Sequence, residues 1–533
     1  MTEMAAKRPN ILIINPDEMR ADTLGHLGNP TGMTPVLDAL VEKDAVSFSQ
    51  AYCQNPVCVP SRCSFFTGLY PHVHGHRTMS YLLHPGEETL FSELKNAGYY
   101  VWMNDRNDLY AGEFPGWMES NADEIFYTGK VKSPPPEENL RGGPGSKNFY
   151  SHYEGRLGLD ENGKNISSDD LVVDAAIDRI LHPMDDRPQC LFLGLMWPHP
   201  PYGCEEPYFS AAARDRIPPR IRAEECSGKP RMEQLIRQYI AMDQYTEADW
   251  NELRGSYLGM CRKVDEQVGR LLKALHDSGT YDNTLILFMS DHGDYTGDYD
   301  LVEKSQNCFE DCLTRVPFIV KPPKGDAIDP GICPALTELV DLYATVMDYA
   351  GVTPGHTHYG HSLRSMVQDR SSRHRDAVFC EGGRLPEEKH CDEYHIDGPQ
   401  GTPEDFLYWP KKKAQSDDVA HGRATMMRTK RYKYVSRTEE DDELYDLEKD
   451  PGERVNRIHD PEYAAVVNEM RGGMLKWLQK TADVVPYQYD SRFTPQMMWE
   501  KVKDMVPPEK EAAVREIIAK GATLPAIIQA CRG

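Results

Sequence analysis

The sequence predicts an α/β fold built on a largely parallel sheet, and two patterns in its 533 residues indicate this fold. Short apolar runs rich in β-branched residues have the length and the flanks of buried strands. Segments with helical spacing and helix-end signals lie between these runs. Strands that alternate with helices favour a mostly parallel sheet with helices on its faces.

Each predicted strand ends just before polar residues that are able to bind a metal ion or a charged ligand. The strands and the residues that follow them are Asn10–Asn15 with Asp17 and Glu18, Tyr99–Met103 with Arg106, Asn107 and Asp108, Cys190–Leu195 with His199, and Thr284–Met289 with Asp291 and His292. In open α/β sheets the ligand site lies outside the carboxyl ends of the strands. These side chains are therefore candidates for one site.

Sequence signals also mark the ends of the predicted helices. Thr34 is expected as a cap and Pro35 as the first residue of the helix that follows the first strand. A second helix is expected to end at Gly98 and a long third helix at Gly279, because glycine commonly follows a helix C-terminus.

The composition argues against several functions. The chain carries 84 Asp and Glu against 60 Lys and Arg, a net charge of −24, which disfavours a broad nucleic-acid surface. The apolar run Ile11–Ile14 is too short for a signal peptide, and no run is long enough to cross a membrane. We therefore expect a cytoplasmic protein with no membrane partner, whose 13 cysteines are mostly reduced thiols.

Two acidic pairs suggest a metal site. Asp17 and Glu18 follow one strand, and Asp291 and His292 follow another. Three carboxylates and one imidazole make an oxygen-rich set that suits a hard divalent cation such as Ca²⁺ or Mg²⁺. The alternative is that each aspartate only caps the turn after its strand.

The segment "NPVCVPSRCSFFTG" places Cys58 where a helix is expected to begin. Pro60 and Ser61 fit the first turn of that helix, and Gly68 fits its end. A helix N-terminus and Arg62 would together lower the pKa of a thiol or hold an anionic oxygen group. On this segment alone, a buried structural cysteine with Arg62 on an outer face is an equal alternative.

The segment "CVPSR" matches the C-x-P-S-R signature of the type I sulfatases of the alkaline phosphatase superfamily, so the chain resembles that family. The resemblance continues in the family's order through most of the chain. Its further segments are "PNILIINPDEMRADTLG", "TGLYPHVHGH", "WPHPPY", "FMSDHGD", "DLVEK", "RVPFIVKPP", "LVDLYATVMDYAGV", "MRTKRYKYV" and "ELYDLEKDPGERVN". The resemblance implies an alkaline phosphatase-like, doubly wound sheet with a smaller C-terminal α+β subdomain.

The resemblance also implies a chemistry. In the family the motif cysteine is oxidised by a formylglycine-generating or sulfatase-maturating enzyme, and the hydrate of the resulting formylglycine is both metal ligand and nucleophile. By this likeness Cys58 is the precursor and Arg62 holds the hydrate. Asp17, Glu18, Asp291 and His292 bind the cation, which is usually calcium, with Mg²⁺ or Mn²⁺ as alternatives. Lys304 and His199 bind the sulfate oxygens of a small anionic substrate, and His199 helps to protonate the leaving oxygen.

The chain departs from the family pattern at two places. Glu18 stands where many members have a second aspartate. The run "DRND" stands where many members have Gly-Lys-Trp-His, although some carry a Lys-Asn-Asp version. Arg106 is expected to replace the lysine as a cation, and Asn107 to donate a hydrogen bond. Asp108 either removes a proton from the hydrate or caps the loop.

Other segments predict the organisation of the chain. A catalytic domain is expected over residues 1–395, a small antiparallel-sheet subdomain over 396–485 and a helical tail over 486–533, with residues 397–418 as loop and linker. Residues 504–533 of this tail are expected to form two short helices, whose apolar face packs on its own chain or on a partner subunit. That face contains Ile517, Ile518, Leu524, Ile527 and Ile528.

The alternating run His72, His74 and His76 is the remaining feature. The resemblance implies that this segment mostly shapes the floor of the pocket, so no second metal site is expected there.

Three functions remain open after these steps. The first is hydrolysis of an aryl, steroid or sugar sulfate monoester. The second is hydrolysis of phosphonate monoesters or phosphodiesters by the same motif. The third is a metal-binding relative without activity, which only the replaced Gly-Lys-Trp-His run favours.

Overall fold

The computed structural model describes residues 8–398, 400–487 and 492–532. The first residues of the chain, residue 399 of the predicted linker, and residues 488–491 and 533 of the predicted tail lie outside this part. The chain divides into two compact units, Met1–Val484 and Val485–Gly533. Among the described helices, none is both long and apolar enough to span a bilayer.

A large sheet forms the centre of the first unit. Within the described residues it has eight strands in the order β10-β2-β9-β8-β1-β6-β3-β4, and all neighbours are parallel except those of β9. The strands are β1 Asn10–Asp17, β2 Val46–Tyr52, β3 Tyr100–Asn104, β4 Glu124–Phe126, β6 Gln189–Pro198, β8 Thr284–Met289, β9 Phe318–Lys321 and β10 Gly331–Glu338. The predicted α/β fold with a mostly parallel sheet is confirmed.

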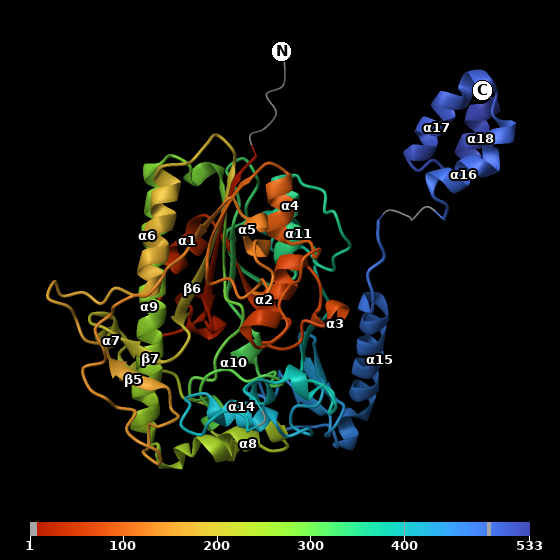
Figure 1. Cartoon of the computed structure of the whole chain (residues 1–533). Coiled ribbons are helices and arrows are strands. Elements are labelled where there is room, and N and C mark those ends of the chain that lie inside the picture. Colours follow the sequence, from red (N-terminus) through yellow and green to blue (C-terminus); the bar gives the residue numbers. More distant parts are fainter. Residues whose placement is uncertain (1–7, 399, 488–491, 533) are drawn as a thin grey trace. The chain divides into compact units, whose positions relative to one another are not determined.

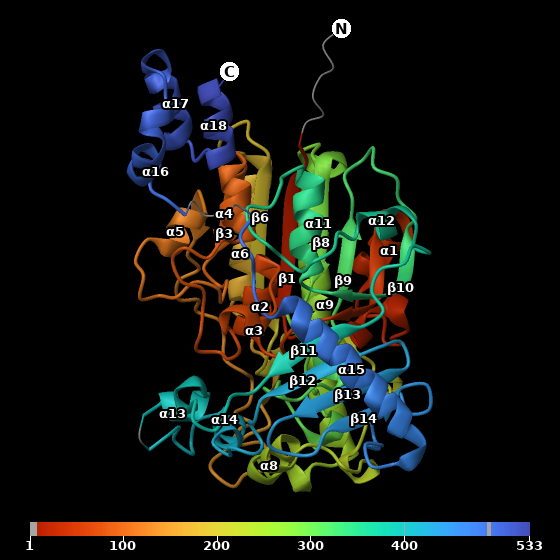
Figure 2. The same cartoon turned by 90° about the vertical axis from the view of Figure 1, so that its right-hand side faces the viewer.

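Helices cover both faces of this sheet (Figure 1, Figure 2). Alternate residues of β1 point to opposite faces, because side chains alternate along a strand. Ile11 and Ile13 join a core with α2 Cys58–Thr67, α4 Leu90–Asn96 and α11 Asp341–Ala350. Leu12 and Ile14 join a second core with α1 Pro35–Lys43, α6 Ser168–Leu181 and α9 Glu247–Asp277.

The helix ends follow the sequence signals. Pro35 is the first residue of α1. The side chain of Thr34 does not cap that helix; Asp265 of α9 accepts the N–H groups of Val36 and Leu37 instead. Gly68 ends α2 in the left-handed conformation (φ 71°), which glycine adopts without steric cost.

A second, antiparallel sheet follows in the same unit, in the order β11-β12-β13-β14. Its strands are β11 Val378–Gly382, β12 Ala424–Arg428, β13 Tyr432–Arg437 and β14 Glu443–Asp446. Helix α15 Ala464–Thr481 packs on it through Val467, Met470 and Trp477. The sheet thus begins before the predicted boundary at residue 396, because β11 pairs with β12.

The predicted linker 397–418 also differs from expectation. It contains α14 Trp409–Gln415, whose Ala414 is fully buried in the second core. Shorter elements complete the unit: α3 Pro71–His74, α5 Trp117–Asn121, β5 Tyr153–Arg156, β7 Tyr202–Cys204, α7 Tyr208–Ala211, α8 Arg231–Ile240, α10 Asp311–Thr314, α12 Arg364–Gln368 and α13 Glu393–Ile396.

The described part of the second unit contains α16 Pro495–Val502, α17 Glu511–Ala519 and α18 Leu524–Arg532. The two helices predicted for the end of the chain are α17 and α18. Ile518 and Ile527 are buried against Trp499 and Val514 within this unit, whereas Leu524 is exposed. Part of the predicted apolar face is therefore used inside the tail itself.

Candidate active site

The carboxyl ends of four neighbouring strands meet at one edge of the central sheet. The strands β8, β1, β6 and β3 are consecutive and parallel, so the residues that follow them lie side by side. They bring together the predicted residues Asp17, Arg106, His199 and Asp291. Helix α2 adds Cys58, its first residue, to the same edge.

Four side chains form a buried cluster there. The Sγ atom of Cys58 lies 3.4 Å from both carboxylate oxygens of Asp17 and 3.2 Å from Nε2 of His292. Asp291 completes the set, and one possible ligand atom from each residue lies within 4.8 Å of the others. Two carboxylates and an imidazole therefore face residue 58 in a space closed to solvent.

Local hydrogen bonds orient this cluster. Nδ1 of His292 lies 2.9 Å from the carbonyl oxygen of Gly293, so Nδ1 donates and Nε2 turns its lone pair toward Cys58. Burial lowers the pKa of His292, which keeps the ring neutral. The hydroxyl of Ser61 donates to the carbonyl oxygen of Asp291 and ties the start of α2 to the end of β8. These contacts hold the ring and helix in a fixed relation.

Arg62 connects the two carboxylates. Its Nε donates to Asp291 Oδ2 at 2.8 Å, its Nη2 donates to Asp17 Oδ2 at 2.9 Å, and its side chain is fully buried. Burial opposes the charge, but Asp291, Asp108 and Asp17 raise the pKa of Arg62 above its ordinary value. The alternative of an arginine on an outer face is therefore wrong.

Burial, and then the carboxylate of Asp17, raise the pKa of the Cys58 thiol well above its ordinary value. The sequence pattern predicts the opposite shift, from the helix N-terminus and Arg62. The difference arises because Arg62 is already paired with carboxylates and because the thiol has no access to water. As a thiol, Cys58 is a poor nucleophile at neutral pH.

Of the three predicted residues in the loop after β3, two contact Asp17 or Arg62 and one does not. Nη2 of Arg106 donates to Asp17 Oδ2 at 2.6 Å, and Oδ2 of Asp108 lies 3.3 Å from Nη1 of Arg62. The amide of Asn107 instead contacts Met118, and its oxygen accepts the N–H of Leu109. The side chain of Asn107 therefore stabilises the turn, and its donor role at the site stays a prediction.

Glu18 lies in a second group beside the first. Its Oε2 accepts from Lys304 Nζ at 2.9 Å, and Lys304 lies 2.8 Å from Nε2 of His199. Burial and the charges of Glu303, Asp294 and Asp17 raise the pKa of Glu18 well above its ordinary value. The backbone at Glu18 is left-handed (φ 70°), a strained conformation of the kind found at functional sites.

His199 is held in one orientation. Its Nδ1 lies 2.6 Å from the carbonyl oxygen of Pro200 and donates to it, so Nε2 faces Lys304 as an acceptor. Burial, and then Lys304, lower the pKa of His199 well below its ordinary value. Burial opposes the charge of Lys304, but Cys58, Glu18 and Glu303 raise its pKa well above the usual range. The pair is therefore a neutral imidazole beside a charged ammonium group.

Sequence reasoning missed Glu303 and Lys411. Glu303 is buried, accepts from Lys411 at 2.8 Å and lies 2.9 Å from Lys304 Nζ. Lys411 belongs to α14, in the segment interpreted as a linker. The only available signal was the position of Glu303 next to Lys304.

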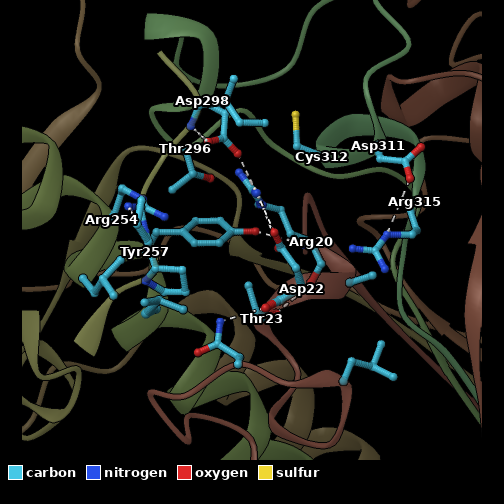
Figure 3. A pocket seen from close by; sticks show the side chains of 18 of the residues that line it. Arg20, Asp22, Thr23, Arg254, Tyr257, Thr296, Asp298, Asp311, Cys312 and Arg315 are labelled. Atoms are coloured by element: carbon cyan, nitrogen blue, oxygen red, sulfur yellow. Dashed lines mark hydrogen bonds and ion pairs between the residues drawn. The ribbon is translucent and has the colours of Figure 1, made fainter. Parts of the chain in front are cut away.

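Figure 3 shows another cavity, with a volume of about 340 Å³. Arg20, Tyr257 and Asp298 line it, but none of the predicted catalytic or metal residues does. The hydroxyl of Tyr257 accepts the N–H of Arg20 and donates to the carbonyl oxygen of Glu18. The backbone of residues 18–20 therefore separates this cavity from the cluster.

The mostly parallel sheet and the buried cluster at its carboxyl edge are those of a hydrolase of the alkaline phosphatase superfamily. The family model described as Sulfatase matches residues 9–352. The chain therefore belongs to the sulfatase family of sulfuric ester hydrolases.

Similar proteins support this assignment. An arylsulfatase of Clostridium perfringens is 25% identical over 504 residues, covering 89% of this chain and 95% of that protein. The multifunctional alkaline phosphatase superfamily protein PehA of Trinickia caryophylli is 25% identical over 542 residues, covering 91% and 98%. The solved phosphonate monoester hydrolase of Agrobacterium radiobacter shares the fold with a TM-score of 0.68 at 22% identity, covering 90% of this chain and all of that one (100%).

Proposed function

We propose that this chain hydrolyses an aryl, steroid or sugar sulfate monoester, with a formylglycine derived from Cys58 as the nucleophile and a divalent cation beside it. The position of Cys58 carries this proposal. Its Sγ lies 3.4 Å from both oxygens of Asp17 and 3.2 Å from His292 Nε2, at the start of a helix. The family assignment and the similarity to an arylsulfatase support the same reaction.

The residues present fit a hard divalent cation. Asp17, Asp291 and His292 offer oxygen and imidazole donors around residue 58, a set that suits Ca²⁺, with Mg²⁺ or Mn²⁺ as alternatives. Oε1 of Glu18 is buried and has no hydrogen-bond partner among the described residues, so it is free to serve as a further donor. When bound, the cation would supply positive charge against the sulfate ester.

The protein's own cations provide the rest of the anion site. Arg62, Arg106 and Lys304 converge on the cluster within a chain of net charge −24. Their fixed positive charge favours the anionic ester and the charge that develops during its cleavage. Lys304 Nζ lies 2.8 Å from the neutral His199 Nε2, so Lys304 would bind a sulfate oxygen, and a proton that it shares with His199 would pass to the leaving oxygen.

Asp108 is the group that the loop after β3 offers for removing a proton from the nucleophile. Its Oδ2 lies 3.3 Å from Nη1 of Arg62, and its side chain is one-third exposed (33%), so it is open to solvent. Its exposure to solvent would let Asp108 release that proton to water after the carboxylate has taken it.

We further propose that the protein works in a reducing compartment with a formylglycine-generating enzyme as its partner. All 13 cysteines are unpaired, which supports an intracellular location. Cys63 is buried on the same helix as Cys58, so its thiol makes a suitable internal control.

The test is a peptide mass measurement across Cys58, on enzyme purified active from its native host. We expect the thiol to be replaced by an aldehyde in wild-type and C63A protein, and both to hydrolyse aryl sulfates. C58A should lose activity and C63A should keep it. An unmodified thiol in fully active enzyme would overturn the proposal.

The second candidate is hydrolysis of phosphonate monoesters or phosphodiesters. Two similar proteins favour this candidate. One is the multifunctional alkaline phosphatase superfamily protein, and the other is the phosphonate monoester hydrolase that shares the fold. Values of kcat/KM for aryl sulfate, phosphodiester and phosphonate substrates separate the two candidates. Sulfatase as the main activity would be abandoned if phosphodiester or phosphonate turnover dominated.

A further inference from the structure

Three side chains outside the active site converge at the surface beside α3. His74 ends α3, His76 follows after one glycine, and Glu87 comes from the next loop. Oε1 of Glu87 lies 3.0 Å from Nδ1 of His74 and 2.8 Å from Nε2 of His76. Potential ligand atoms of all three lie within 4.8 Å of one another.

The surroundings fix the direction of these groups. Nδ1 of His76 lies 3.0 Å from the carbonyl oxygen of Tyr81 and donates to it, which turns Nε2 toward Glu87. The other oxygen of Glu87 accepts the backbone N–H of His84 at 2.6 Å. Metal-binding histidines and carboxylates in proteins are oriented by contacts of this kind.

We propose that Nδ1 of His74, Nε2 of His76 and Oε1 of Glu87 bind a zinc ion, with water as the fourth ligand. Two imidazoles and one carboxylate are a zinc-type donor set, unlike the oxygen-rich set of the active site. At zinc bond lengths of about 2.1 Å, neighbouring ligands of a tetrahedral site lie roughly 3.3 Å apart. The observed 2.8 and 3.0 Å separations need only small side-chain movements to reach that value.

The surface position fits an open coordination site. The side chain of His74 is 36% exposed, whereas those of His76 and Glu87 are mostly covered. Water and the metal therefore have a path to the cluster. His72 is not part of it, because its ring contacts Glu381 and the carbonyl oxygen of Thr481.

The zinc would tie α3 to a loop that supports the active site. In the loop that carries Glu87, Leu83 donates its N–H to the carbonyl oxygen of Leu109 at 2.8 Å and accepts the N–H of Ala111 at 3.1 Å. Residues 109–111 directly follow Asp108. We expected the histidine run to shape the floor of the pocket, and that role does not explain why His74 and His76 both contact Glu87.

Zinc binding by the full chain tests the proposal. Wild type, H76Q, E87Q and the control H84Q are stripped with a chelator, incubated with Zn²⁺ alone and desalted, and zinc per chain is measured by mass spectrometry. His84 is the matched control, because only its backbone N–H contacts Glu87 while its ring packs against Phe114. We expect wild type and H84Q to retain one zinc more per chain than H76Q and E87Q.

Cobalt substitution and thermal unfolding give independent readouts. Wild type and H84Q loaded with Co²⁺ should show the strong visible absorption of a tetrahedral site, and H76Q should lack it. Zn²⁺ should raise the Tm of wild type and H84Q but not of H76Q or E87Q. E87Q keeps the size of the side chain and provides the comparison if H76Q folds poorly. Equal zinc content and equal Tm shifts in all four proteins would overturn the proposal.

Discussion

Replacing Arg62 with lysine tests whether the arginine fork holds the active-site carboxylates in place. The guanidinium of Arg62 donates through two different nitrogens, Nε to Asp291 at 2.8 Å and Nη2 to Asp17 at 2.9 Å. Lysine keeps the positive charge but is a single point donor on a flexible stem. R62K therefore keeps one of these contacts and loses the other, although Arg106 still donates to Asp17.

The size of the effect follows from these contacts. A hydrogen bond to a charged group contributes about 1.5–3 kcal/mol, and a buried group left unpaired costs at least as much. Since about 1.4 kcal/mol corresponds to ten-fold in rate, the loss of one contact should lower kcat/KM by roughly 10-fold to 150-fold. R62Q should lose more, because it also removes the positive charge beside Asp291, whereas Asp17 keeps that of Arg106.

The assay is hydrolysis of a chromogenic aryl sulfate, with activity divided by the fraction of chains that carry formylglycine. This correction is needed because Arg62 lies in the segment that the proposed modifying enzyme would read. R77K is the matched control, since Arg77 pairs with Glu381 and contacts none of the cluster residues. Wild-type kcat/KM per modified R62K chain would refute the reasoning.

Two further changes test single groups. E18Q should weaken the activation of the enzyme by divalent cations by about 10-fold to 100-fold. Oε1 of Glu18 is buried and available as a metal ligand, and Oε2 positions Lys304. An unchanged cation dependence of activity would contradict this prediction. Burial raises the pKa of Asp265 from 3.8 to about 6. The protonated carboxyl therefore contributes its full stabilisation of the fold below pH ~4. About 3 kcal/mol of the free energy of unfolding is then lost as the pH rises through 6. The free energy of unfolding of D265N, measured in urea, should not fall over this pH range. Parallel pH profiles for wild type and D265N would refute the role given to Asp265.

The strand-end residues were predictable because of one geometric rule. Parallel strands present their carboxyl ends at the same edge, so Asp17, His199 and Asp291 had to lie close together once β1, β6 and β8 were neighbours. The motif around Cys58 added the helix that delivers the remaining group. Pattern and topology were sufficient here because each residue ends a regular strand or lies within two residues of its end.

Loop residues were not predictable in the same way. Asn107 and Asp108 are adjacent in sequence, yet one side chain contacts Met118 and the other contacts Arg62. The backbone at Asp108 is left-handed (φ 50°), a conformation that aspartate adopts more often than most residues but that the flanking sequence does not specify. Lys411 reaches Glu303 across 108 positions of sequence, so only the folded chain reveals that contact.

The charges that gather at the site explain how the cation that we propose would help it to hold an anionic ester. Its charged side chains are Arg62, Arg106, Lys304 and Lys411 on one side and Asp17, Glu18, Asp108, Asp291 and Glu303 on the other. With every group ionised, the formal sum is −1, which repels a sulfate ester. A divalent cation beside residue 58 would turn the sum to +1 and offset the repulsion between Asp17 and Asp291. Under this proposal, cation binding would be coupled to substrate binding through the same carboxylates that Arg62 holds in place.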